Sequence, residues 1–285
     1  MPEIWFPNLG IQIQKLSNVA FTIFGVRIYW YGVIIGSGVL IALYLALREA
    51  KRTGQDPEKY IDFTIIGIIF CIIGARLYYV LFSWSDYKDD LWKIFAIREG
   101  GLAIYGGILA GIITAIVYTR KKNMNFWLFA DTAAPSLLFG QIMGRWGNFF
   151  NREAFGGYTD GLFAMRYLKN QVDAISPSVL EHIVNINGTE YIQVHPTFLY
   201  ESMWNLAVFI LLLVLRRKKK FDGEIFGLYL LGYACGRVWI EGLRTDQLLI
   251  GNTTIAVSQV LSAVLIIIAV VLLIYRNKKQ NMKFM

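Results

Sequence analysis

Seven runs of apolar residues recur along the chain, each about long enough to cross or nearly cross the hydrocarbon core of a bilayer as a helix. The runs cover residues 29–48, 61–82, 102–119, 126–143, 198–215, 224–243 and 255–275. Of the 285 residues, 56% are hydrophobic and only 17% are charged, which is more apolar surface than a soluble domain of this length needs. The sequence therefore predicts an all-α polytopic membrane protein with about seven transmembrane helices. The fourth run is the weakest because Asp131 and Pro135 interrupt it.

Positively charged residues gather at one end of alternate runs. Short basic clusters follow the first, third, fifth and seventh runs: Arg48/Lys51/Arg52, Arg120–Lys122, Arg216–Lys220 and Arg276/Lys278/Lys279. Cytoplasmic loops carry such an excess of Lys and Arg, so we expect the N-terminus outside the membrane and the C-terminus in the cytoplasm. The formal net charge is +8, but basic clusters between apolar runs favour contact with anionic lipid over nucleic acid. Nucleic acid is therefore not an expected partner.

Several classes of protein are disfavoured by motifs that the chain lacks. Cys71 and Cys235 both fall inside apolar runs, which predicts neither a disulfide framework nor a metal site. The sequence has no H-E-x-x-H pair for zinc and no G-x-S-x-G elbow for a nucleophilic serine. We therefore expect no metal and no cofactor. No basic start with a short apolar core and a small-residue cleavage site precedes the first run, so we expect that run to direct insertion itself.

One connection is far longer than an ordinary loop. Residues 144–197 follow the fourth run, on the side that the basic clusters assign to the exterior. They contain polar turns at 159–161 and 185–188, and residues 190–194 alternate as a strand does. We expect a small extracytoplasmic head with some strand, inserted between helices four and five of a single integral membrane domain that spans residues 1–285.

The segment that opens this connection concentrates polar groups at the membrane boundary. Residues 144–157 read GRWGNFFNREAFGG, which places Arg145, Asn148 and Glu153 just beyond an apolar run. Ionisable groups at that depth are costly and usually serve a function. Arginine suits phosphate because its planar fork stays charged and donates two parallel hydrogen bonds. The segment thus predicts a site for an anionic lipid headgroup.

A polar stripe crosses the sixth run. Tyr233, Arg237, Glu241 and Arg244 are spaced so that a helix places them on one face, near its outer end. One interpretation is a binding site for an anion. The alternative is a structural ion pair between Arg237 and Glu241 that seals the bundle.

Three further residues are candidates on weaker grounds. Tyr105 lies in a glycine-rich segment at the outer end of the third run, where its hydroxyl can donate a hydrogen bond into a polar pocket. His195 precedes Pro196 at the start of the fifth run and is either a base, a headgroup contact or a structural spacer. Arg76 lies near the outer end of the second run and is either a site residue or a snorkelling side chain.

Five motifs together resemble a known family. They are Tyr29-Trp-Tyr-Gly, Gly-Gly-x-x-x-Tyr-Gly-Gly at 100–107, G-R-x-G-N-F-x-N-x-E-x-F-G at 144–156, His-Pro-x-x-x-Tyr-Glu at 195–201, and Gly-Tyr-x-x-x-Arg-x-x-x-Glu-x-x-Arg at 232–244. In this order, across seven runs, they resemble the signature of the bacterial prolipoprotein diacylglyceryl transferases. The resemblance covers essentially the whole chain.

The resemblance implies a seven-helix enzyme of the bacterial inner membrane. Such an enzyme moves the sn-1,2-diacylglyceryl group of phosphatidylglycerol to the lipobox cysteine of a preprolipoprotein signal peptide, and it releases glycerol 1-phosphate. By the same resemblance, Arg145 and Arg237 hold the phosphoglycerol headgroup. The residues that shape the site around them are Tyr31, Asn148, Glu153, Gly156, Tyr233 and Glu241, with Arg244 and His195 close by and Arg76 among the substrate-binding candidates.

The identity of the catalytic base stays open at this point. Many members of the family have His at the position of Tyr105, and a tyrosine with a pKa near 10 is a poor base at neutral pH. Either Tyr105 acts only as a hydrogen-bond donor here, or Glu153, Glu241 or His195 takes the proton, or the arginines lower the pKa of the substrate thiol enough. The rival class is a transporter of an anionic lipid or solute, but the charged pairs cluster toward the outer side only, which favours the enzyme.

Overall fold

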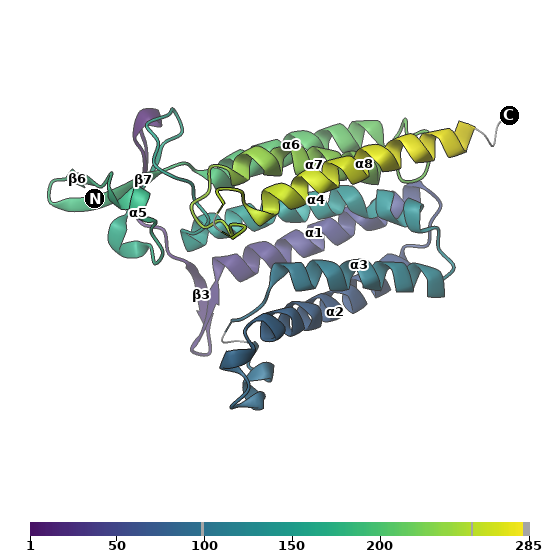
Figure 1. Cartoon of the computed structure of the whole chain (residues 1–285), viewed down its shortest axis with the longest axis horizontal. Helices are drawn as coiled ribbons and strands as arrows, with labels where there is room; N and C mark the ends of the chain where they lie inside the picture. The colour runs from purple at the N-terminus through teal and green to yellow at the C-terminus, as the bar shows by residue number, and fades with distance from the viewer. Residues whose placement is uncertain (98–99, 252, 282–285) are drawn as a thin grey trace. The chain divides into compact units, whose positions relative to one another are not determined.

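The computed structural model describes residues 1–97, 100–251 and 253–281, and it is mostly helical (Figure 1). The long helices are α1 (Trp30–Arg52), α2 (Glu58–Phe82), α3 (Ile104–Lys121), α4 (Phe126–Asn151), α6 (Thr197–Leu215), α7 (Glu224–Glu241) and α8 (Val257–Asn281). Each long helix coincides with one predicted apolar run, which confirms their positions. Among the described helices, α1, α2, α6 and α8 are long and apolar enough to cross a membrane.

The fourth helix differs from its prediction at two places. It runs without interruption through Pro135 and continues to Asn151, so the first eight residues of the expected connection, 144–151, are helical. Proline is tolerated in a membrane helix where neighbouring groups satisfy the freed carbonyls, and the surrounding side chains of Thr132 and Ser136 are buried. As a result the G-R-x-G-N motif lies on a helix and not in a loop.

The chain divides into two compact units, each described by itself below. The first contains Met1–Ala42 and Ala134–Met285, and the second contains Leu43–Ala133. Helices α1 and α4 are each divided between the units, with one end in the first unit and the other end in the second.

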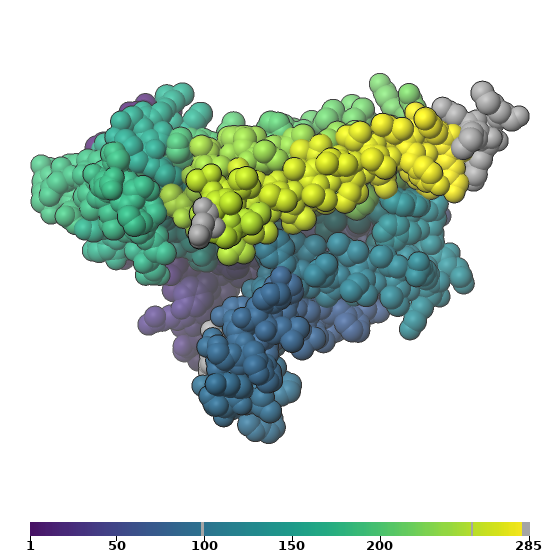
Figure 2. Space-filling view, in the orientation of Figure 1, coloured from purple at the N-terminus to yellow at the C-terminus, as the bar shows by residue number. Residues whose placement is uncertain are grey.

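The helical part of the first unit is held by close contacts at small residues. A Cβ added at Gly236 would lie 2.2 Å from Cδ1 of Trp204, and one added at Gly232 would lie 2.7 Å from Cγ1 of Val208. The indole of Trp204 also donates to the carbonyl of Gly232 at 2.8 Å. Glycine thus lets α6 and α7 approach closely. Helix α8 exposes most of its apolar surface, as its yellow atoms show in Figure 2.

The head is built on a five-stranded antiparallel sheet with the order β2-β1-β5-β7-β6. Its strands are β1 (Ile4–Phe6), β2 (Ile11–Ile13), β5 (Met165–Leu168), β6 (Val184–Ile186) and β7 (Thr189–Val194). The predicted strand at 190–194 is confirmed as part of β7. The sheet also includes β1 and β2 near the N-terminus, which lie outside the expected head of residues 144–197. They join it because Ile4 of β1 pairs with Tyr167 of β5, although the two residues are far apart in the sequence.

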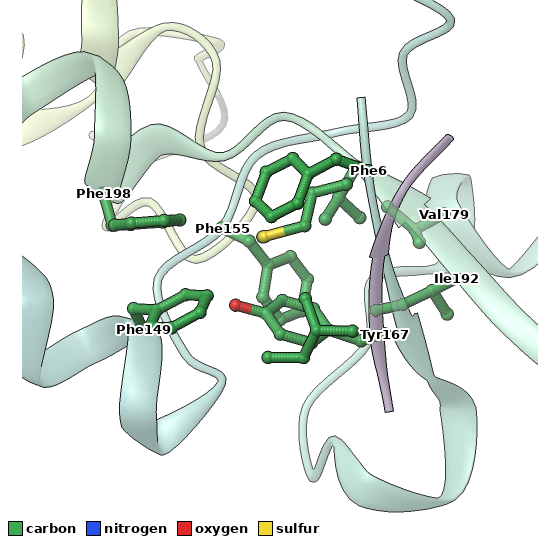
Figure 3. Packing of buried hydrophobic residues seen from close by; sticks show 10 residues of the cluster. Phe6, Phe149, Phe155, Tyr167, Val179, Ile192 and Phe198 are labelled. Carbon is green, nitrogen blue, oxygen red and sulfur yellow. The ribbon is translucent and has the colours of Figure 1, made fainter. Parts of the chain in front are cut away.

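Apolar side chains join this sheet to the helices beneath it. Phe6, Tyr167 and Ile192 from the strands pack in one core with Phe149 of α4 and Phe198 of α6 (Figure 3). The rings of Phe149 and Phe198 are 4.6 Å apart between centroids. The head is therefore continuous with the C-terminal end of α4 and the N-terminal end of α6, where the charged motifs lie.

A partly buried ion pair fastens the N-terminus to the head. The Glu3 carboxylate accepts from the Leu16 amide at 2.7 Å and pairs with Arg152 at 2.9 Å. Burial alone raises the pKa of Glu3, but the Leu16 amide, the Gln171 side chain and Arg152 outweigh it and hold the pKa below its usual range.

Because the folded pKa of Glu3 is lowered, its stabilisation is present above the unfolded value near 4.3 and is lost as the pH falls through the folded value. We expect Glu3→Gln to cost the head about 2 kcal/mol at pH 7 and to flatten its loss of stability between pH 5 and 3. Hydrogen exchange of the β1 and β5 amides measures this. An unchanged acid dependence in the variant would assign the acid sensitivity to another carboxylate.

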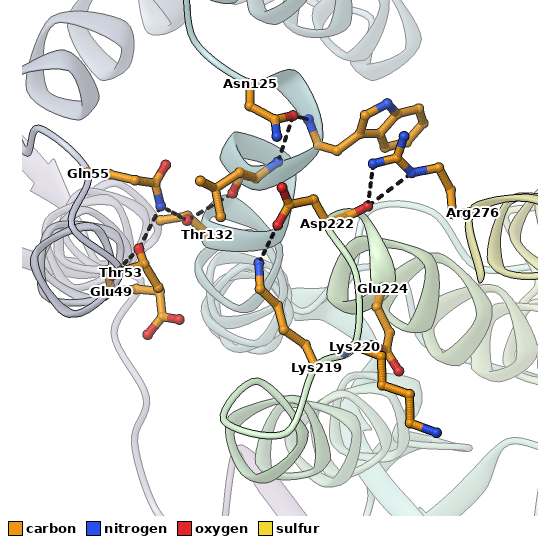
Figure 4. A network of polar contacts seen from close by, with 12 residues as sticks. Glu49, Thr53, Gln55, Asn125, Thr132, Lys219, Lys220, Asp222, Glu224 and Arg276 are labelled. Atoms are coloured by element: carbon orange, nitrogen blue, oxygen red, sulfur yellow. Dashed lines mark hydrogen bonds and ion pairs between the residues drawn. The ribbon is translucent and has the colours of Figure 1, made fainter. Parts of the chain in front are cut away.

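The second unit packs α2 against α3 at glycines. A Cβ added at Gly106 would lie 2.3 Å from the Gly74 carbonyl oxygen, so the two backbones meet directly. Tyr60 of α2 stacks on Phe129 of α4, and Gln55 in the connection between α1 and α2 donates to Thr132 of α4 at 2.7 Å. Figure 4 shows this contact, and separately the bonds from Lys219 and Arg276 to Asp222 in the first unit.

Candidate active site

Two arginines on different helices of the first unit share one buried carboxylate. Nε of Arg145 on α4 lies 3.0 Å from Oε1 of Glu201 on α6, and Nη1 of Arg237 on α7 lies 3.0 Å from its other oxygen. Arg237 also pairs with Glu241 at 2.5 Å. The two glutamates are almost fully buried, whereas the side chains of Arg145 and Arg237 keep 20% and 14% exposure. The guanidinium groups therefore remain partly accessible while their counter-ions are enclosed.

The sixth-run stripe continues outward from this pair. Arg244 lies 3.9 Å from Glu241 and binds Asp246 through two bonds of 2.9 and 2.6 Å. Burial raises the pKa of Asp246, but the Arg244 guanidinium outweighs it and holds that pKa below its usual range. The arginine cluster, as we call it, consists of Arg145, Glu201, Arg237, Glu241, Arg244 and Asp246. Its three positive and three negative charges cancel, so the cluster offers oriented hydrogen-bond donors and no net positive charge.

The segment at 144–157 extends the cluster through a chain of amides. Arg145 donates to Asn148 at 3.2 Å, and Asn148 donates in turn to Glu153 at 2.8 Å. Asn151 donates to the same oxygen of Glu153 at 3.2 Å. The helical turn of α4 creates this line, because Arg145 and Asn148 are three residues apart on one face.

Tyr31 belongs to the same neighbourhood. A Cβ added at Gly147 would lie 2.9 Å from Cδ2 of Tyr31, so the tyrosine ring rests on the bare backbone of α4 between Arg145 and Asn148. A cavity of about 530 Å³ opens beside the ring, and Asn151 is among the residues that line it.

Gly156 is where three distant segments of backbone meet. Its amide donates to the His195 carbonyl at 2.9 Å, and Gly156 bridges to Arg244. The His195 amide donates back to Gly157 at 2.9 Å, and the Gly157 amide donates to Leu243 at 2.9 Å. A Cβ at Gly156 would lie 2.7 Å from both the His195 Cβ and the Leu243 carbonyl oxygen, so only glycine fits this junction.

The ring of His195 lies 3.3 Å from the Tyr200 hydroxyl, through Nδ1. Burial lowers the pKa of His195, so the imidazole is neutral at neutral pH. On α7, Tyr233 lies one turn before Arg237 and stacks on Tyr229 with centroids 6.2 Å apart. These contacts place both residues in the first unit with the cluster.

Two predicted residues belong to the second unit. Tyr105 is the second residue of α3 and is partly buried. Arg76 is buried and donates to the carbonyls of Lys93, Ile94, Gly100 and Gly101 at 2.5–2.9 Å. These hydrogen bonds tether the backbone that leads into α3. The assignment of Arg76 to substrate binding stays a prediction.

Glu201 is a residue of this cluster that the sequence analysis did not single out as a candidate. It closes the His-Pro-x-x-x-Tyr-Glu motif, and a carboxylate inside an apolar run is a signal of function by itself. The helical spacing that groups Arg237 with Glu241 could not reveal it, because its two partners lie on other helices.

The fold combines helices of membrane-spanning length with a small head, and an arginine–carboxylate cluster joins α4, α6 and α7. These features define a multi-pass membrane protein with a polar site. Residues 18–275 match the family described as prolipoprotein diacylglyceryl transferase. The chain belongs to this family, as its motifs predicted.

Similar proteins carry the name phosphatidylglycerol–prolipoprotein diacylglyceryl transferase. The chain is 43% identical to the one from Enterococcus faecalis over 276 residues, covering 96% of this chain and 95% of the relative. It is 44% identical to the one from Listeria innocua over 278 residues, covering 96% and 94%. It is 42% identical to the one from Bacillus mycoides over 272 residues, covering 94% of each.

Proposed function

We propose that Arg145 and Arg237 hold the phosphate of phosphatidylglycerol in this chain while its diacylglyceryl group moves to a cysteine thiol. As a member of its family, the chain is a transferase of lipoprotein biosynthesis that transfers a diacylglyceryl group to prolipoproteins. The observation that carries the proposal is the shared, buried Glu201, which fixes two partly exposed guanidinium groups side by side. Paired forks of this kind suit a phosphate with several acceptor oxygens.

The chemistry is a displacement at carbon. The sulfur of the substrate cysteine forms a bond to the glyceryl carbon that carries the phosphate, and the bond from that carbon to the phosphate oxygen breaks with its electron pair. The leaving group is glycerol 1-phosphate, and the thiol proton is lost as the sulfur attacks. The arginines stabilise the charge that develops on the departing oxygen, and they are already oriented before the reaction starts.

The contacts of the candidate bases differ. Glu241 is bound to Arg237, and Glu153 accepts hydrogen bonds from two amides, so the oxygens of both carboxylates already have partners. The backbone amide and carbonyl of His195 are both hydrogen-bonded at the Gly156 junction, and burial lowers the pKa of its imidazole, which is neutral at neutral pH. We infer that His195 positions the Gly156 junction, that Tyr105 donates a hydrogen bond, and that the thiol ionises in the field of the arginines.

This inference predicts the pH dependence of the His195→Asn variant. Since burial lowers the pKa of His195 below its usual 6.5, its imidazole stays largely neutral between pH 7 and 8. We expect kcat/KM of the wild type and the variant to rise in parallel over this range, following the ionisation of the substrate thiol. The variant is slower by about tenfold because the junction is disturbed. A flat profile in the variant alone would instead identify His195 as the base.

All seven long helices span the membrane in this proposal, including α3, α4 and α7. The basic clusters at the ends of α1, α3, α6 and α8 support an N-terminus and head outside a bacterial inner membrane and a cytoplasmic C-terminus. Residues 1–285 then form one membrane domain with an extracytoplasmic head. An impermeant maleimide applied to intact cells should label Asn187→Cys but not Lys219→Cys, and the reverse pattern would invert the topology.

The test of the function uses purified protein, phosphatidylglycerol and a signal peptide with a lipobox cysteine. Mass spectrometry should detect a thioether-linked diacylglyceryl adduct on this peptide and none on the matched Cys→Ser peptide. Folded, lipid-loaded protein that forms no adduct would overturn the assignment and favour a transporter of the anionic lipid.

A further inference from the structure

A two-stranded hairpin precedes the first long helix and is separate from the head. Its strands are β3 (Val19–Ile23) and β4 (Val26–Tyr29), and α1 begins at the next residue, Trp30. A lone hairpin of this size is marginally stable in water. Something outside the hairpin therefore has to cover it.

The register of the hairpin separates two chemically different faces. Phe21 pairs with Ile28 and Ile23 pairs with Val26, so these four apolar side chains share one face. Phe21, Ile23 and Val26 are 48%, 50% and 63% exposed. The opposite face carries the Thr22–Arg27 pair. The hairpin is thus amphipathic, with its apolar face uncovered by the chain.

The turn at the tip of the hairpin has an aromatic residue where Asn or Gly is usual. Phe24 and Gly25 both have positive φ, 48° and 80°, as the central residues of a type I′ turn do. Asn or Gly takes the first of these positions at lower steric cost than an aromatic residue. Phe24 nevertheless occupies it, with its side chain fully exposed. The aromatic ring at this strained tip is therefore free to contact a partner outside the chain.

The position of the hairpin indicates which partner that is. Within the first unit, Figure 1 shows the hairpin projecting sideways from the first turn of α1, at the level where the helices end and the head begins. Tyr29, Trp30 and Tyr31 at this junction are exposed aromatic residues, which gather at membrane–water interfaces. Exposed aromatic side chains thus mark the junction between the hairpin and the exposed apolar surface of α1.

We propose that the β3–β4 hairpin is an interfacial anchor that lies in the outer surface of the bilayer. Phe24 and the face of Phe21, Ile23 and Val26 enter the boundary between headgroups and acyl chains, and Arg27 faces the lipid phosphates. An anchor in this position holds Tyr29 at the membrane surface. It thereby also fixes Tyr31, two residues further on, whose ring lies against Gly147 next to Arg145. The proposal rests on the membrane insertion of α1 and not on the transfer reaction.

Depth-dependent fluorescence quenching tests the anchor in the full chain. Single cysteines are placed in a Cys71→Ala, Cys235→Ala background, labelled with bimane and reconstituted in phosphatidylglycerol-containing nanodiscs with nitroxide lipids. We expect Phe24→Cys to be quenched several-fold more by a nitroxide high on the acyl chain than Asn187→Cys on the exposed β6–β7 turn. Thr22→Cys, on the opposite face, is the matched control and should be quenched less than Phe24→Cys. Val264→Cys on α8 is the reference for a label inside the bilayer.

Val26→Cys replaces Phe24→Cys if the tip variant does not fold. Equal, weak quenching at positions 24, 26 and 187 would overturn the proposal. Quenching at position 24 that appears only with a nitroxide on an added signal peptide would also overturn it, because the hairpin would then bind peptide.

Discussion

Replacing Arg237 by alanine is expected to lower kcat/KM for diacylglyceryl transfer by about 10³-fold, the order of loss seen when one preorganised donor to a developing charge is removed. Arg237 is the stronger choice of the two arginines because it binds both buried glutamates, at 3.0 and 2.5 Å. Its loss removes a phosphate ligand and leaves Glu241 without its nearest cation. We expect Arg145→Ala to follow the same pattern.

Three controls separate chemistry from folding. Arg237→Lys keeps the charge but not the planar fork, so it should recover activity only in part. Arg217→Ala removes an exposed arginine just beyond the other end of α6 and should transfer at the wild-type rate. The peptide assay measures turnover, and detergent elution and circular dichroism measure folding. Normal turnover in folded Arg237→Ala would refute the headgroup assignment.

Glu201→Ala is expected to damage stability as well as activity. Removing one member of a buried ion pair leaves an uncompensated charge and costs about 3–5 kcal/mol. Glu201 has two such partners, Arg145 and Arg237, and each loses an acceptor at 3.0 Å. We expect a lowered unfolding temperature together with the loss of transfer.

Glu201→Gln distinguishes the two effects. The amide keeps one oxygen acceptor, so this variant should unfold closer to the wild type while transfer stays impaired, because only one of the two guanidinium groups is still held. Ser202→Ala changes the neighbouring buried residue of α6 and should leave both readouts unchanged. A fully active Glu201→Gln variant would show that the carboxylate does not position the arginines.

The helices were predictable from the sequence because an apolar run of membrane length is a local signal. The end of α4 was not, since residues 144–151 are polar enough to look like a loop although they continue the helix. The N-terminal strands β1 and β2 were missed because each is three residues long and β1 pairs with Tyr167 and Arg166. Short strands with distant partners carry no periodicity long enough to detect.

The candidate site shows the same division. Arg237 and Glu241 could be paired from helical spacing, and the structure places them in contact. Gly156 became interpretable only once His195 and Leu243 were placed around it, because the reason for glycine there is the backbone of other segments. Glu201 depends wholly on the packing of three helices.

The cancelled charges of the arginine cluster bear on how the enzyme lets go of its product. Glycerol 1-phosphate carries more negative charge than the phosphodiester from which it is cut. A pocket of unopposed arginines would retain it. In the proposed site each guanidinium already has a carboxylate partner, so release of the phosphate would exchange one set of ion pairs for another and leave the site ready for the next lipid.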